Sequence, residues 1–471
     1  MAIVFGTEGW RAIIAEEFTV ENVCKVAQAI AAHFLTAATG HTPLTMAVGY
    51  DTRFLSDRFA RAVCEVFAAN GVHSVLSDRA VPTCAVSRYV VAHRFVSGIV
   101  ITASHNPPIY NGIKVKEAFG GSAMSETVAS IERRIGRQPM KRLAFAQGVE
   151  QRLIRVAEFL PTFEKGIRDY VDLKAIRQSR LKVMVDAMHG TADSLIERLV
   201  AGGRCQIETL HAQPDPLFGG HAPEPIAVHL QELARTLRRR RGDVGLATDG
   251  DADRIGVIAP NGQFLNPGQV LCILLEHLIT SRPWRGAVVK TVSNTSMIDR
   301  MAQGLGLKLL EVPVGFKHIA KLMLEDDVLI GGEESGGIGI RGYLPERDGV
   351  LMGLLVLEAM AMQGRGILQI LRRLERRFGR WVYVRKDLTV APDQVNRVFE
   401  RLRTNPPARI AGVPVRERRT LDGVKLIDRE GNWLLFRRSG TEPIVRVYAE
   451  SLAAKRADRL LGFGVQLVNS S

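Results

Sequence analysis

Paired cysteines and long apolar runs are both missing from this chain. Its five cysteines are odd in number and scattered through 471 residues, and none of them forms a C-x-x-C pair. This pattern argues against a disulfide framework and against a zinc site. The longest apolar stretch, residues 350–362, is interrupted by Glu358 and is well short of the roughly 20 residues that a bilayer requires. We therefore expect no association with a membrane.

The first eighteen residues lack the apolar core of a secretory signal. Arg11, Glu16 and Glu17 place charges where that core would lie. Because the sequence also has neither paired cysteines nor an apolar run of spanning length, it predicts a cytoplasmic protein.

Acidic side chains are fewer than basic ones, with 49 Asp and Glu against 63 Lys and Arg. The resulting net charge of +14 favours an anionic partner, either a nucleic acid or a small phosphate ester. The densest basic run, residues 238–241, follows an amphipathic pattern and precedes Gly242. Basic side chains at a helix C-terminus interact favourably with the helix dipole. We therefore interpret this run as the end of a helix, and we expect no nucleic-acid partner.

Short apolar runs alternate with helical periodicities along most of the chain. Such alternation predicts parallel or mostly parallel sheets with helices on both faces, and it places ligands at the carboxyl ends of the strands. The predicted strands are residues 45–49, 98–102, 182–186, 244–248, 287–292 and 328–330, and the predicted helices are 20–35, 59–70, 192–201 and 270–279.

The pattern changes after Trp381 to antiparallel strand signals and one clear helix over residues 392–403. A length of 471 residues corresponds to about three domains, or to four compact ones. We predict four: α/β domains over residues 1–150, 151–258 and 259–375, and an α+β domain over residues 376–471.

The first of four loops that could do chemistry together contains Ser104 and spans residues 102–107. Pro107 disfavours a helix at Asn106, so Ser104 is displayed on a loop at the end of a buried strand. A serine in this position can carry a phosphoryl group if its charge is neutralised. The G-x-S-x-G pattern of an esterase is absent. Taken alone, a structural turn is the commoner explanation.

The second loop contains Asp249, Asp251 and Asp253, directly after an apolar run. Three carboxylates at alternating positions can converge and offer hard oxygen ligands to Mg²⁺. A calcium-binding EF-hand would need Gly at its sixth position and Glu at its twelfth, where this chain has Arg254 and Pro260. The alternative, a solvated acidic turn, would leave three like charges crowded together. We therefore predict a magnesium site.

The third and fourth loops offer groups that suit a phosphorylated sugar. In the glycine-rich third loop, residues 331–337, Glu333 and Ser335 could exchange hydrogen bonds with sugar hydroxyls. In the fourth, residues 437–443, the Arg437 guanidinium and neighbouring hydroxyls on a glycine turn could hold a phosphate. Each loop alone is equally well explained as a turn.

Together and in this order, the four loops resemble the α-D-phosphohexomutase family, which includes phosphoglucomutase, phosphomannomutase and phosphoglucosamine mutase. The likeness extends over the whole chain. The resemblance implies three related, doubly wound α/β domains and a smaller C-terminal domain around a central cleft. The matching motifs are residues 5–11, 50–53, 102–107, 111–114, 186–190, 215–220, 249–254, 314–317, 331–337 and 437–443.

The resemblance also implies roles for particular residues. Ser104 is expected to be the phosphoserine and to hold Mg²⁺ together with the three aspartates. Lys114 and Lys317 are the candidates for proton transfer. The cations expected to line the cleft are Arg11, Lys114, Arg254 and Lys317. The residues expected to bind substrate are His105, Glu333, Ser335, Arg437, Ser439, Gly440 and Thr441.

The implied activity is an intramolecular phosphotransfer between hexose 1-phosphate and hexose 6-phosphate, with a hexose 1,6-bisphosphate as intermediate and activator. Residues 333–336 and 315–317 resemble the phosphoglucomutase branch. Gly337 stands where members that favour mannose or glucosamine phosphates often have His. Glucose phosphate is therefore the expected substrate, with a mannose or dual enzyme, and then a glucosamine enzyme, as alternatives. A monomer or homodimer is expected. Glu8 departs from the Asp or Ser that is frequent in relatives.

Two other classes of function share part of this pattern. A phosphatase that uses a phosphoserine would need Ser104 and the metal but neither the sugar loop nor a second phosphate loop. A protein that only binds anions would have no use for three clustered acids.

Overall fold

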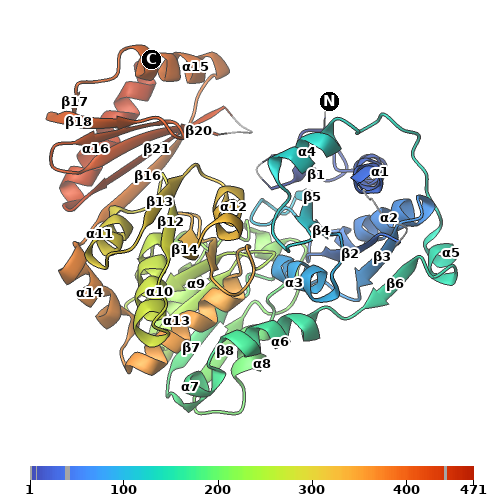
Figure 1. Cartoon of the computed structure of the whole chain (residues 1–471). Helices are drawn as coiled ribbons and strands as arrows, with labels where there is room; N and C mark the ends of the chain where they lie inside the picture. Colours follow the sequence, from blue (N-terminus) through green and yellow to red (C-terminus); the bar gives the residue numbers. More distant parts are fainter. Residues whose placement is uncertain (1–2, 7, 38–42, 440–442) are drawn as a thin grey trace.

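The computed structural model describes residues 3–6, 8–37, 43–439 and 443–471, which form four sheets and their covering helices (Figure 1). The first three sheets mix parallel and antiparallel pairs and are covered by helices on both faces. The fourth is antiparallel throughout. The predicted fold class, three α/β domains followed by a smaller α+β domain, is confirmed.

The first sheet has the strand order β1-β5-β4-β2-β3-β6. Because side chains alternate along a strand, Met46 and Val48 pack against α1 and α2, whereas Ala47 packs against α3 on the opposite face. The elements of this domain are β1 Trp10–Ile13, α1 Val20–Ala37, β2 Thr45–Tyr50, α2 Ser56–Ala69, β3 His73–Ser77, α3 Thr83–His93, β4 Ser97–Ile101, β5 Tyr110–Glu117, α4 Ser125–Glu132, α5 Phe145–Glu150 and β6 Ile154–Ala157.

The second sheet has the order β11-β10-β9-β7-β8. The basic run lies in the last turn of α9, as the sequence predicts. The elements are α6 Leu160–Tyr170, α7 Leu173–Gln178, β7 Lys182–Asp186, α8 Leu195–Val200, β8 Gln206–Leu210, the 3₁₀ turn η1 Phe218–Gly220, α9 Gln231–Arg240, β9 Val244–Thr248, β10 Ile255–Ile258 and β11 Phe264–Leu265.

The third sheet has the order β13-β12-β14-β15. Its elements are α10 Pro267–Ser281, β12 Ala287–Thr291, α11 Ser296–Gly304, β13 Leu309–Val312, α12 Phe316–Glu325, β14 Val328–Gly332, β15 Ile338–Ile340, α13 Gly349–Gln363 and α14 Ile367–Phe378. Helix α13 is buried along most of its length and packs into the core that the second and third domains share. Within the described residues no single helix is long and apolar enough to cross a membrane; α13 and α14 meet that criterion only as a pair bent by 84°.

The fourth sheet has the order β16-β21-β20-β19-β18-β17. One face packs on α15 and α16, and on the other face Trp433 and Tyr448 meet Val292 of the third domain. The elements are β16 Val382–Thr389, α15 Pro392–Thr404, β17 Arg409–Ile410, β18 Val413–Arg419, β19 Val424–Asp428, β20 Trp433–Arg438, β21 Ile444–Ser451 and α16 Ala454–Asn469.

Sequence patterns missed the edges of the sheets. Strand β6 pairs with β3 beyond the expected boundary at residue 150, and β11 pairs with β10 beyond the boundary at residue 258. Both are short strands of two to four residues, too short to show a periodicity. The antiparallel strands β5, β10 and β15 and the helix α16 were also not predicted. Each of these antiparallel strands comes shortly after one of the predicted functional loops: β5 after residues 102–107, β10 after 249–254 and β15 after 331–337.

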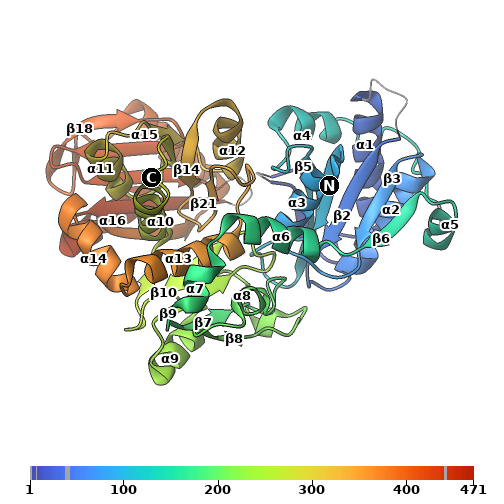
Figure 2. The same ribbon diagram turned by 60° about the horizontal axis from the view of Figure 1, so that its bottom comes forward.

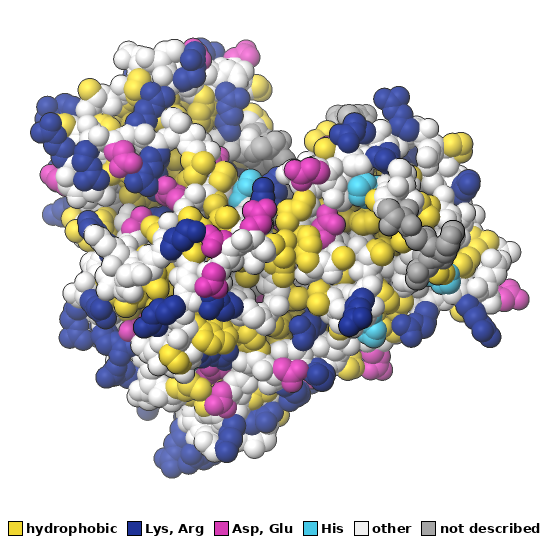
Figure 3. Space-filling view, viewed as in Figure 1, with side chains coloured by type: hydrophobic (Ala, Val, Ile, Leu, Met, Phe, Trp, Pro, Cys, Tyr) yellow, Lys and Arg dark blue, Asp and Glu magenta, His cyan; other side chains and the backbone are white. Residues whose placement is uncertain are grey.

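The first and fourth domains lie on opposite sides of the molecule, and the second and third domains connect them (Figures 1 and 2). In the space-filling view the surface is hollowed between the first and fourth domains, and acidic, basic and histidine side chains gather there (Figure 3).

Candidate active site

The serine loop is held by buried hydrogen bonds at the end of β4. Ser104 is 1% exposed and has a positive φ of 52°, a conformation that costs a non-glycine residue about 1–3 kcal/mol. Its N–H donates to Thr102 Oγ1 over 2.8 Å, and the Thr102 hydroxyl donates to Asp51 Oδ2 over 2.6 Å. These contacts hold the Ser104 hydroxyl toward the second domain.

The predicted nucleophile and the predicted metal loop are in direct contact. Ser104 Oγ donates a hydrogen bond of 2.8 Å to Asp249 Oδ2. Thr83, the first residue of α3, donates to Asp251 twice: from its N–H to the carbonyl over 3.0 Å and from its hydroxyl to Oδ2 over 2.5 Å. The carboxyl ends of β4 and β9 therefore meet, although they belong to different domains.

The aspartate loop has the properties of a divalent-cation site. Asp249, Asp251 and Asp253 are fully buried, and one oxygen from each lies within 4.8 Å of the other two. Among the described residues, Oδ1 of Asp251 and Oδ1 of Asp253 have no hydrogen-bond partner. Buried carboxylate oxygens without partners are costly unless a cation satisfies them. Hard oxygen donors in this arrangement fit Mg²⁺.

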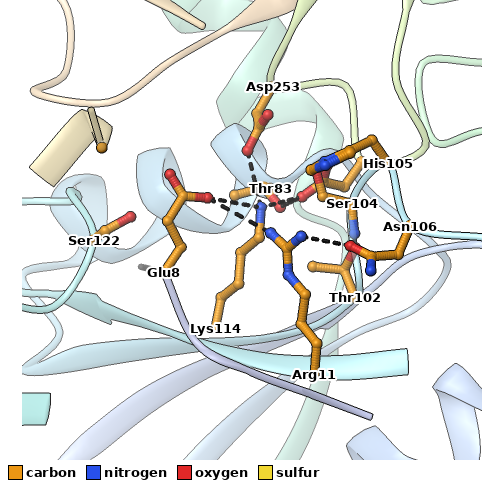
Figure 4. Close-up of polar contacts among 12 residues, drawn as sticks. Glu8, Arg11, Thr83, Thr102, Ser104, His105, Asn106, Lys114, Ser122 and Asp253 are labelled. Atoms are coloured by element: carbon orange, nitrogen blue, oxygen red, sulfur yellow. Dashed lines mark hydrogen bonds and ion pairs between the residues drawn. The ribbon is translucent and has the colours of Figure 1, made fainter. Parts of the chain in front are cut away.

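Lys114, on β5, lies beside the aspartates. Its Nζ donates to Asp251 Oδ2 over 2.6 Å. It also donates to Asp253 Oδ2 over 2.9 Å (Figure 4). Burial alone would lower the pKa of Lys114, but these two carboxylates outweigh burial and raise it above its usual value. Lys114 is therefore positively charged, and in this state it can donate a proton but cannot accept one.

Further cations surround the serine. Arg11, on β1, donates from Nη1 to Asn106 Oδ1 over 2.6 Å (Figure 4). Arg254 is 8% exposed, and its Nε lies 4.0 Å from Asp249 Oδ2. His105 Nδ1 is 3.4 Å from Ser104 Oγ, and burial together with the charges of Arg254 and Arg11 lowers the pKa of this histidine well below its usual value. His105 is therefore neutral.

Sequence patterns did not identify Arg347, which joins three domains. It pairs with Glu8 of the first domain, with Asp253 of the second (2.6 Å) and with Glu333 of the third (3.4 Å). Burial would raise the pKa of Glu8, but Arg347 and Lys114 lower it to about 2. The acidic side chain of Glu8 was the available signal, because a carboxylate buried in a site needs a cationic partner.

The sugar loop follows β14. Burial raises the pKa of Glu333 to about 7, and its Oε1 accepts a hydrogen bond of 3.0 Å from the N–H of Gly315. Ser335 is half-buried two residues further on. Lys317 is half-buried in the first turn of α12, and its side chain forms no hydrogen bond or ion pair with the described residues. A Cβ at Gly337 would lie 2.2 Å from Arg347 Cδ, so a side chain there would displace Arg347.

The fourth loop extends from the end of β20. Arg437 is 8% exposed, and its Nε donates to Asp422 Oδ2 over 2.9 Å. The same oxygen accepts a hydrogen bond of 2.8 Å from the N–H of Val314, which precedes Gly315 at the sugar loop. Arg437 is thus linked to the third-domain side of the hollow. Ser439 donates its N–H to the carbonyl of Ile444 over 3.0 Å. The predicted phosphate ligands Gly440 and Thr441 lie outside the described residues.

A buried serine hydroxyl beside three clustered aspartates that could hold a divalent cation, with cationic side chains around it, is suited to covalent phosphoryl transfer. A second cationic loop at the rim suits a substrate with another phosphate. The four-domain fold and this site together define an enzyme of the phosphohexomutase class.

Comparison with known proteins agrees with this class. The phosphoglucomutase/phosphomannomutase family matches this chain in four parts. Its α/β/α domains I, II and III match residues 2–142, 159–262 and 266–378, and its C-terminal domain matches residues 392–462. The chain belongs to the phosphoglucomutase/phosphomannomutase family. The resemblance drawn from the ten motifs is thereby confirmed.

Individual relatives cover the full chain and bear different substrate names. A phosphoglucomutase/phosphomannomutase of Thermococcus kodakarensis is 28% identical over 100% of this chain and 99% of its own. A phosphoglucosamine/phosphogalactosamine mutase of Sulfurisphaera tokodaii is 29% identical over 98% of each. The crystal structure of a "putative phosphomannomutase" from Thermus thermophilus is 34% identical, covers 100% of this chain and 99% of that one, and superposes with a TM-score of 0.87.

Proposed function

We propose that this enzyme interconverts the 1-phosphate and 6-phosphate of a hexose, with glucose preferred, through a phosphoserine at Ser104. The hydrogen bond of 2.8 Å between Ser104 Oγ and Asp249 Oδ2 supports the proposal most directly, because it brings the Ser104 hydroxyl beside the aspartates that would hold Mg²⁺. Mg²⁺ would be held by Asp249, Asp251, Asp253 and the Ser104 oxygen, and when bound it would withdraw charge from the transferring phosphoryl group.

The proposed reaction consists of two matched transfers. In the first, the bond from phosphorus to Ser104 Oγ breaks and a bond to the free hydroxyl of a hexose monophosphate forms, giving a hexose 1,6-bisphosphate. The sugar hydroxyl loses one proton and Ser104 Oγ gains one, so no other reactant is required. After the bisphosphate turns around, its other phosphoryl group returns to Ser104.

Residues of this chain would supply charge and orientation. Arg11, Lys114 and Arg254 would neutralise the transferring phosphoryl group. Arg437 and Ser439, with Gly440 and Thr441, would hold the phosphate that does not react, and His105, Glu333 and Ser335 would contact the substrate. Lys317, which forms no ion pair with the described residues, is a candidate for contact with phosphate or for proton transfer. Excluding water from the hollow would prevent hydrolysis of the phosphoserine.

The glucose preference rests on the sugar loop. Because Gly337 has no side chain, the buried Arg347 side chain can lie directly against it. A histidine at position 337 would collide with Arg347. The charged group nearest Glu333 would therefore differ in a relative with histidine there. The names of the relatives favour mannose and glucosamine phosphates as the competing substrates.

A direct test combines product analysis with mass spectrometry. Glucose, mannose and glucosamine 1-phosphates are each supplied with the matching 1,6-bisphosphate, and 6-phosphate and inorganic phosphate are both measured. We expect the highest kcat/KM for glucose 1-phosphate and little inorganic phosphate. The intact protein should carry one phosphate that is absent in Ser104→Ala. Release of inorganic phosphate as the main product would indicate a phosphatase instead, and a phosphate retained by Ser104→Ala would exclude Ser104 as the carrier.

A further inference from the structure

Two of the sequence motifs, residues 50–53 and 215–220, supply no group that contacts substrate or Mg²⁺ in the proposed reaction. They meet at Arg53, a buried arginine in the loop after β2. Its guanidinium donates to four backbone carbonyls of the segment that carries Ser104: those of Ser104 (2.7 Å), Asn106 (2.6 Å), Pro107 (2.8 Å) and Tyr110 (2.9 Å). One buried side chain therefore hydrogen-bonds the backbone of this segment at four positions.

The same arginine is oriented by the network that holds the start of the loop. Its Nε donates to Asp51 Oδ2 over 3.1 Å, the oxygen that also accepts from the hydroxyl of Thr102. Arginine presents five N–H groups in a rigid planar fork, whereas lysine presents three on one flexible atom. Lysine could keep the charge beside Asp51 but could not reach all four carbonyls. A lysine at this position would therefore leave some of the carbonyls around Ser104, which has a positive φ, without their donor.

The second domain closes over the outer face of this guanidinium. The ring of Phe218, in η1, lies with its centroid 4.9 Å from Arg53 Cζ. Thr52, the neighbour of Arg53, donates its hydroxyl to the carbonyl of His189 over 3.0 Å. Residues 186–190 and 215–220 of the second domain therefore both contact the 50–53 loop. This contact is separate from the one between Ser104 and Asp249.

We infer that Arg53 is a positioning residue for Ser104, and that Phe218 couples its orientation to the second domain. The inference rests on the proposed function, since it concerns the serine that would carry the phosphoryl group. The N–H groups of Arg53 donate to backbone carbonyls and to Asp51, so its role is to place Ser104 and not to bind phosphate. A change at Arg53 should then slow the phosphorylation of Ser104 while affecting substrate affinity little.

The test compares two arginine-to-lysine substitutions. Arg456 is the matched control, because it also donates to two backbone carbonyls, those of Ala411 (2.6 Å) and Ile410 (3.0 Å), and to an aspartate, Asp428. Dephosphorylated enzyme with Mg²⁺ is mixed with glucose 1,6-bisphosphate, and the mass of the intact protein is followed by rapid quench. We expect Arg53→Lys to slow phosphorylation of Ser104 by about 100-fold, the loss typical of a misplaced reacting group, with KM within about threefold.

Both lysine variants should lower the midpoint of thermal unfolding, but Arg456→Lys should phosphorylate within about twofold of the wild-type rate. Equal rates for Arg53→Lys and Arg456→Lys would overturn the inference. If the wild-type protein takes no phosphate on Ser104, the proposed function fails instead, so the two failures are distinguishable.

A second pair of variants keeps the test decisive if Arg53→Lys does not fold. Phe218→Leu retains an apolar side chain but removes the ring over Arg53. Phe145→Leu removes a similar ring, 5.4 Å from the Arg61 guanidinium and away from the serine loop. We expect Phe218→Leu to slow phosphorylation by about threefold or more, and Phe145→Leu to leave it unchanged. Equal rates for these two variants would overturn the coupling to the second domain.

Discussion

The hydroxyl of Thr83 should determine how tightly the aspartate loop binds Mg²⁺. Thr83 is fully buried, and its hydroxyl donates a hydrogen bond of 2.5 Å to Asp251 Oδ2. Thr83→Val preserves the shape of the side chain and the bond from its N–H to the Asp251 carbonyl, so only the contact with the carboxylate is lost. That carboxylate would then be oriented by Lys114 alone.

The size of the effect follows from the kind of bond. A buried hydrogen bond to a charged group contributes about 1.5–3 kcal/mol, and groups that orient metal ligands commonly change metal affinity by about 10- to 100-fold. We expect Thr83→Val to weaken Mg²⁺ binding by about tenfold. Isothermal titration calorimetry on the purified protein measures this affinity directly, without substrate.

Thr248→Val is the matched control. Thr248 is also fully buried, and it immediately precedes Asp249, but its hydroxyl has no hydrogen-bond partner among the described residues. Removing a buried hydroxyl without a partner should leave stability unchanged or raise it slightly. Mg²⁺ affinity should therefore stay within about twofold of the wild-type value. If both valine variants bind Mg²⁺ with equal affinity, Thr83 does not orient the metal loop.

Three further outcomes are expected. Arg437→Lys should raise KM for the sugar phosphate by about tenfold, because lysine cannot form a bidentate contact with phosphate. The control Arg438→Lys should change KM by less than about twofold, since Arg438 is exposed and lies over Phe399. Glu333→Gln should lower kcat/KM by about 10- to 100-fold, and an unchanged value would remove Glu333 from the sugar site. Burial and the charge of Lys290 lower the pKa of Lys425 from 10.5 to about 8. Folding favours the neutral form of Lys425, so the free energy of unfolding should decrease as pH falls from about 10.5 through about 8. Chemical denaturation of the wild type should show this decrease, of up to about 3 kcal/mol in total. Lys425→Met should not show it.

The sequence by itself determined the class of fold and the kind of chemistry. Alternating strand and helix patterns are local, because each depends on the spacing of apolar residues within a segment. The loops between them are also local, so each could be picked out as a candidate, but only the resemblance of all the motifs in order gave Ser104, the three aspartates and the sugar loop their expected roles. Antiparallel strands such as β5 and β15 were not predicted, because their pairing partners, and not their own periodicity, define them.

Only the tertiary structure decided which of these loops meet and which charges they carry. Arg347 and Glu8 are 339 positions apart in the chain, and their pairing becomes visible only when the first and third domains are in contact. The positive charge of Lys114 and the raised pKa of Glu333 depend on burial and on neighbours from other domains. Sequence spacing carries no information about such distances, because the free energy of a buried charge is set by the atoms packed around it.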